Sequence, residues 1–69
     1  MKNTNQKLSL RELELLQFAA NGYSNKQIAE AIHLSVYTID TRNRSIIEKL
    51  NAKNMKEAIA IGIRNKWIE

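Results

Sequence analysis

Apolar residues recur at helical spacing in four separate stretches of this 69-residue chain. Residues three or four positions apart share one face of a helix, so this spacing predicts amphipathic helices. No stretch alternates apolar and polar residues as a half-buried strand does, and no proline interrupts the pattern. We therefore predict an all-α fold, a four-helix bundle in residues 8–69, preceded by a disordered polar tail at residues 1–7.

Each apolar stretch opens on a residue that can cap a helix. Ser9, Ser24 and Asn54 are followed three residues later by Glu or Gln, which is the spacing of a capping box. Ser35 has only Thr38 at that place, whose side chain is too short to complete the box. The first predicted helix follows Ser9 and is ended by Asn21 and Gly22, and the others cover residues 25–32, about 36 to 50, and 55 to about 64.

Residues that tolerate left-handed backbone follow these helices. Gly22 is the natural left-handed residue after the first helix. His33 stands in a tight link where positive φ is expected, and histidine is enriched there among non-glycine residues. Asn51 is expected to end the third helix. Beyond the fourth helix, Trp67 and Ile68 are expected to fold back as a C-terminal plug.

Residues 24–50 hold a short helix, a sharp turn and a longer helix. The longer helix has Ile39, Ile46 and Leu50 on one apolar stripe, with Ile47 at its margin. This arrangement is typical of a DNA-reading helix-turn-helix, in which the second helix presents a polar face. The residues of that face are Asp40, Thr41, Arg42, Arg44 and Ser45.

Composition narrows the classes of function. The net charge of +4 and the pI near 9.7 suit a polyanionic partner, although a mildly basic domain without such a partner fits them as well. With no cysteine and one histidine, no disulfide or structural zinc site is expected. No apolar run approaches about 18 residues and no signal peptide is evident, which favours the cytoplasm.

The chain lacks the groups of an enzyme site. It has no paired acid and base, no nucleophile beside a base and no glycine-rich phosphate loop. We expect no catalysis, no cofactor, no metal and no small-molecule ligand. A helical protein-docking module without DNA binding is the alternative function, but Thr38, Thr41, Arg42 and Arg44 make a polar, cationic surface unlike an apolar docking groove.

Four segments together resemble the LuxR-type helix-turn-helix domain, also the output domain of NarL/FixJ-type response regulators and of GerE-like regulators. The resemblance covers residues 8–68, and its segments read LSLRE (8–12), ANGYSNKQIA (20–29), LSVYTI (34–39) and IIEKL (46–50). It implies a domain that binds double-stranded DNA as a dimer and regulates transcription. It further implies that the third helix enters the major groove and that the fourth helix forms the dimer contact.

The chain departs from the family pattern at four positions. Asp40 stands where a lysine is usual, Arg42 where a histidine is usual, and Met55 where an arginine opens the last helix. Asp40 could accept from cytosine N4 or steer Arg44. Lys66 replaces the glycine before the terminal apolar pair, so we expect Asn65 to take the helix-ending turn.

From these patterns we assign three groups of contacts. Base edges are assigned to Asp40, Thr41 and Arg44, with Ser45 at the margin. DNA phosphates are assigned to Tyr37, Thr38, Arg42 and Lys49, and to Ser24, Asn25 and Lys26 at the start of the second helix. A weak homodimer, stronger on DNA, is assigned to Ala60, Ile61, Ile63, Arg64 and Trp67, because the fourth helix is apolar nearly all round.

Some of these assignments have structural alternatives. Thr38 could serve only in the helix cap, Lys49 could be a solvated cation or bond a nearby carbonyl, and Tyr37 could be half-buried packing. RNA polymerase is a further candidate partner.

Overall fold

The computed structural model describes residues 8–69, so the tail predicted at residues 1–7 lies outside the described residues. Within the described range the chain forms four helices and no strand, which confirms the all-α prediction. The observed boundaries agree with the predicted ones, except that the third helix ends at Lys49 instead of Leu50. The helices are α1 (Leu10–Ala20), α2 (Asn25–Ile32), α3 (Val36–Lys49) and α4 (Met55–Arg64).

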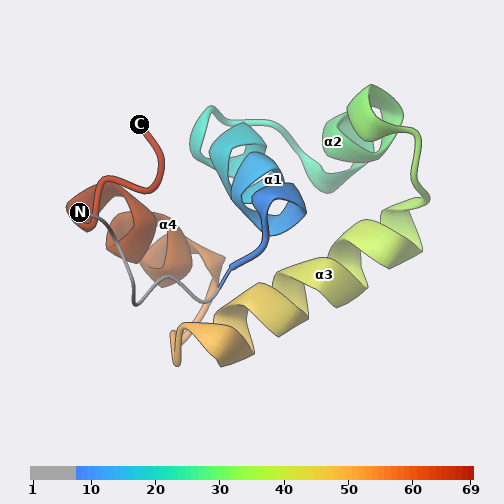
Figure 1. The fold of residues 1–69 in the computed structure, drawn as a ribbon. Helices are drawn as coiled ribbons and strands as arrows, with labels where there is room; N and C mark the ends of the chain where they lie inside the picture. Colours follow the sequence, from blue (N-terminus) through green and yellow to red (C-terminus); the bar gives the residue numbers. More distant parts are fainter. Residues whose placement is uncertain (1–7) are drawn as a thin grey trace.

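The long helix α3 lies along one side of the domain (Figure 1). Helix α1 packs between α2 and α4, and α3 crosses both of these outer helices. Only one side of α3 can therefore be covered by the other helices. Its opposite side faces away from the domain along the whole length of the helix.

The core is made of aliphatic side chains from all four helices. Leu16, Ile28, Ile39 and Ile46 are fully buried, and each contributes about 1.5–3 kcal/mol relative to an exposed side chain. Ala58 and Gly62, four residues apart on α4, are both buried. The lack of a side chain at residue 62 allows α4 to approach α1 closely.

The helix starts follow the predicted caps. Ser9 and Ser24 form complete capping boxes, in which the serine hydroxyl and the Glu12 or Gln27 side chain satisfy backbone N–H groups reciprocally. Ser35 makes only the serine half, as predicted. Its Oγ accepts from the Thr38 N–H at 3.0 Å.

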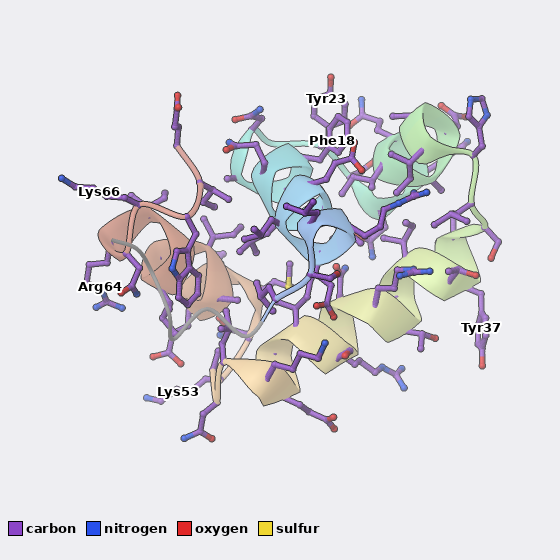
Figure 2. The ribbon with its side chains drawn as sticks, viewed as in Figure 1. Phe18, Tyr23, Tyr37, Lys53, Arg64 and Lys66 are labelled. Atoms are coloured by element: carbon purple, nitrogen blue, oxygen red, sulfur yellow. The ribbon has the colours of Figure 1, made fainter. Side chains whose placement is uncertain are left out.

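All four helices are followed by a residue in the left-handed region, and the chain then folds back in a Schellman motif. In each motif the N–H of the next residue bonds the carbonyl five positions earlier, as Tyr23 does to Phe18 at 3.1 Å. The rings of these two residues pack with centroids 4.9 Å apart, side by side in Figure 2. The left-handed residues are Gly22, His33, Asn51 and Lys66, with φ of 92°, 60°, 55° and 61°.

The expectation for the last turn is wrong. Lys66, and not Asn65, takes the left-handed conformation, while Asn65 has a φ of −92°. A lysine costs about 1–2 kcal/mol there relative to glycine. The turn directs Ile68 onto α1 and α4, where it is 5% exposed, and its burial offsets that cost.

A partly buried ion pair joins α1 to α3. Lys49 Nζ lies 2.9 Å from both carboxylate oxygens of Glu12, whose Oε1 also accepts from the Ser9 N–H. Burial would raise the pKa of Glu12, but the hydrogen bond from Ser9 and the hydrogen bonds and charge of Lys49 outweigh it and lower that pKa. Glu12 thus caps the start of α1 and also links it to the last turn of α3.

We predict that Gly22→Ala costs about 1 kcal/mol of unfolding free energy, because φ is positive although there is space for a methyl group. Chemical denaturation measures this cost. Gly22→Asn is the control, since asparagine tolerates the left-handed region and should lose less. Equal losses in the two variants would mean that backbone strain is not the cause.

We predict that Glu12→Gln costs about 1–2 kcal/mol at neutral pH, because it keeps an acceptor for the cap but removes the ion pair. The folded-state pKa is lowered, so this stabilisation is complete above about pH 5 and is lost as the pH falls below about 4. Chemical denaturation of the wild-type protein and of Glu12→Gln, from about pH 3 to about pH 7, measures the difference in their unfolding free energy. A difference in unfolding free energy that does not decrease at acid pH would contradict the stabilising role of the ion pair.

Candidate nucleic-acid interface

The burial of one row of α3 fixes which residues face outward. Ile39, Asn43 and Ile46 are its buried residues. On the opposite side, four residues at helical spacing form a continuous exposed row, which we call the outer row of α3. The outer row consists of Tyr37, Thr41, Arg44 and Glu48.

Tyr37 opens the outer row and is its most prominent member. Its side chain is 80% exposed and points away from the domain (Figure 2). The alternative that Tyr37 is half-buried packing is therefore wrong. Its backbone carbonyl accepts a 3.1 Å hydrogen bond from Thr41 Oγ1, so the hydroxyl hydrogen of Thr41 is engaged while its oxygen stays free to accept.

Arg44 and Asp40 form an exposed ion pair one helical turn apart. The Arg44 Nη2 and Asp40 Oδ2 atoms are 3.2 Å apart, and the side chains are 78% and 50% exposed. An exposed pair at this spacing is worth only about 0.3–0.5 kcal/mol. Arg44 can therefore exchange the carboxylate for another acceptor at little cost. Asp40 therefore contacts Arg44, and its role in steering Arg44 toward DNA stays a prediction.

The side of α3 beside the outer row holds the other predicted contacts of this helix. Thr38, Arg42 and Ser45 are each partly exposed there. Thr38 Oγ1 accepts from the Ser35 hydroxyl at 2.9 Å and keeps its own hydrogen to donate. Arg42 Nε is buried and has no hydrogen-bond partner among residues 8–69. Its stem therefore lies along the protein.

The start of α2 lies beside the middle of α3. Asn25 is linked to α3 by a hydrogen bond from Asn43 Nδ2 to Asn25 Oδ1, at 3.1 Å. Ser24 and Lys26 on either side are exposed. Two segments that sequence analysis grouped only by function are thus also neighbours in space.

Lys49 has a partner that the sequence did not predict. Its ammonium group bonds Glu12, so it is neither a solvated cation nor bound to a carbonyl. Its side chain is 42% exposed, and a phosphate contact would have to use a donor hydrogen not engaged by the carboxylate. Glu48 also belongs to the outer row but was not among the predicted contacts. Its helical spacing from Thr41 and Arg44 could have indicated its position in this row.

The residues assigned to dimer contact lie away from the outer row. Ala60, Ile63 and Arg64 are exposed, with Ile63 at 49%, whereas Ile61 and Trp67 are partly buried. Figure 2 shows Arg64 at the opposite end of the view from Tyr37. The two surfaces therefore lie on separate parts of the domain.

The candidate interface is an exposed helix face, and the described part of the chain contains no pocket. Its side chains supply an aromatic ring, hydroxyls, an exposed guanidinium and carboxylates, which can donate and accept hydrogen bonds to an extended partner. Within residues 8–69, none of the helices has the length and apolar character needed to cross a bilayer.

Comparison with known proteins identifies a matching family and several similar proteins. The family model of bacterial regulatory proteins, luxR family, matches residues 6–62. Oxygen regulatory protein NreC of Staphylococcus carnosus (strain TM300) is 40% identical over 62 residues, which is 90% of this chain and 29% of that protein. Transcriptional regulatory protein DegU of Brevibacillus brevis is 36% identical over 62 residues, 90% of this chain and 26% of its own.

NreC of Staphylococcus epidermidis (strain ATCC 12228 / FDA PCI 1200) is 42% identical over 62 residues, 90% of this chain and 28% of that protein. The chain therefore spans less than a third of the length of these curated relatives.

Proposed function

Because the chain belongs to the luxR family of bacterial regulatory proteins, we propose that it binds double-stranded DNA sequence-specifically and regulates transcription. The observation that carries this proposal is the outer row of α3, an uncovered polar face on the longest helix of the domain. A helix of this kind fits the major groove, which is about 12 Å wide.

In this proposal α3 reads the bases. Arg44 leaves Asp40 to donate to guanine O6 and N7, while the freed carboxylate accepts from cytosine N4. Thr41 presents its methyl group and free lone pairs, and Ser45 lies at the margin. Tyr37, assigned to phosphates from the sequence, stands on the same row as Thr41 and Arg44 and so could also reach a base edge or sugar.

The phosphate contacts come from both sides of that row. Thr38 and Arg42 flank it on α3, and Ser24, Asn25 and Lys26 approach from the start of α2. Phosphate contacts fix register and orientation and bring most of the salt dependence of binding. Lys49 is the weakest member of this set, because it already neutralises Glu12.

We further propose that two copies pair through the exposed stripe of α4 on DNA. The stripe holds Ala60, Ile63 and Arg64, with Ile61 and Trp67 at its edges. One helix pair buries less than the roughly 1,200 Å² of a stable complex, so the dimer is weak in solution. DNA that holds two half-sites about 34 Å apart would favour it. RNA polymerase is a proposed further partner, and the cytoplasm, where bacterial DNA lies, is the proposed location.

We expect Arg44→Ala to weaken binding to the selected site by about 1–3 kcal/mol and to relax preference at one base pair. Arg42→Ala, its control on the same helix, should weaken binding to all sequences and lower the salt slope by about one. The measurement is selection from a random duplex library followed by titration at several salt concentrations. The reverse pattern would exchange the roles of the two arginines, and a wild-type protein without duplex binding would refute the function.

We expect Ile63→Glu to abolish cooperativity on a two-half-site duplex while leaving binding to a single half-site unchanged, because the charge would be buried in the α4 contact. Leu10→Glu is the matched control, since Leu10 is an 84% exposed leucine on α1. Binding isotherms on both duplexes provide the measurement. Cooperativity that survives Ile63→Glu undiminished would place the dimer contact elsewhere.

A further inference from the structure

Asn43 is a polar residue in the buried row of α3. It lies one turn from Ile39 and one turn from Ile46, both 0% exposed, and is itself 7% exposed. A buried amide lowers stability unless its hydrogen bonds are satisfied. Only one end of this amide is satisfied, since Nδ2 donates to Asn25 while Oδ1 is buried without a partner among residues 8–69. An aliphatic side chain would suit the core better, so stability alone does not account for an asparagine here.

The bond from Asn43 fixes the orientation of Asn25. A primary amide carries an acceptor at one end and two donor hydrogens at the other. Because Asn25 Oδ1 accepts from Asn43, its Nδ2 group is the end left for an outside partner. Asn25 is the first residue of α2 and is partly exposed, and it adjoins the exposed Lys26. The outward end of this side chain is thus a donor beside a cation.

We propose that Asn43 is a positioning residue of the DNA interface, which holds Asn25 so that Nδ2 donates to a phosphate. This inference rests on the proposed function. A phosphate oxygen accepts from Nδ2 but would be repelled by Oδ1, so the fixed orientation removes the unproductive rotamer before binding. A side chain that is already ordered loses less conformational entropy when the contact forms.

A brace between α2 and α3 with no part in DNA binding is the competing role. It predicts that loss of Asn43 alters folding, or tilts α3 and weakens every DNA contact alike. The positioning role predicts that the loss acts on DNA binding only through Asn25. A double-mutant cycle on binding free energy distinguishes the two, because it isolates the coupling between the two residues.

The variants are Asn43→Val, Asn25→Ala and the double mutant, titrated on the selected duplex. Each single change should weaken binding about 5- to 10-fold, the size expected for the loss of one ordinary hydrogen bond. The double mutant should bind within about twofold of either single variant, as coupled residues do. Thermal unfolding of Asn43→Val should show stability kept or raised, because the change removes a buried unpaired carbonyl.

Thr41→Ala supplies a matched control cycle, since Thr41 is a candidate DNA contact on α3 that does not bond Asn43. Here the effects of Asn43→Val and Thr41→Ala should multiply. Full multiplication with Asn25→Ala as well would overturn the positioning role, as would wild-type affinity in either single variant. If wild-type protein binds no duplex, the proposed function and this inference fall together; additive effects on a wild-type protein that binds overturn this inference alone.

A measurement on wild-type protein keeps the test independent of how the variants fold. In ¹H–¹⁵N spectra, the Asn25 side-chain amide signals should shift when the selected duplex is added, and the shift should reverse with salt as phosphate contacts are lost. Asn21, whose side chain bonds Gln17 on the surface of the domain, provides the reference signal. Asn25 side-chain amide signals that do not shift when the duplex is added would overturn the proposal.

Discussion

The burial of Ile39 and Ile46 decides how α3 is rotated about its own axis, and the properties of the candidate interface depend on that rotation. Both side chains are fully buried against α2 and α4, so neither can turn outward without opening the core. Side chains on the far side of the same helix are thereby fixed as a row. A turn of α3 by one residue would place Asp40 and Arg44, or Thr38 and Arg42, at buried positions and would move Ile39 and Ile46 out of the core, at a cost of several kcal/mol.

Two polar contacts between helices further fix how the helices are placed around this apolar core. The Glu12–Lys49 pair ties the first turn of α1 to the last turn of α3, and the Asn25–Asn43 bond ties α2 to the middle of α3. The two bridges hold the candidate recognition helix at two places along its length. Desolvation offsets part of the energy of such contacts, but each of them forms in only one arrangement of the helices.

The small size of the domain explains the character of α4. Ala58 and Gly62 face the core, and at Gly62 an added methyl group would lie 3.1 Å from Leu16 and Ile68. With its inner side packed so closely, the helix still has Ala60 and Ile63 on the outside. Three other helices are too few to cover α4 on both sides, so an apolar stripe stays open at a surface that the outer row does not use.

Local signals in the sequence determined the helices, their starts and the turns that follow the first three of them. A cap such as Ser24 with Gln27, or a left-handed residue such as Gly22 or His33, acts on neighbours within a few positions and can be read directly. The multi-part pattern in residues 8–68 likewise identified the family. Tertiary structure alone decided the partner of Lys49, the burial of Asn43, the direction of Tyr37 and the turn at Lys66. Each of these depends on groups that meet only after the helices pack, 37 residues apart in the case of Glu12 and Lys49. No local spacing encodes such a meeting, since it is set by the rotation and approach of whole helices.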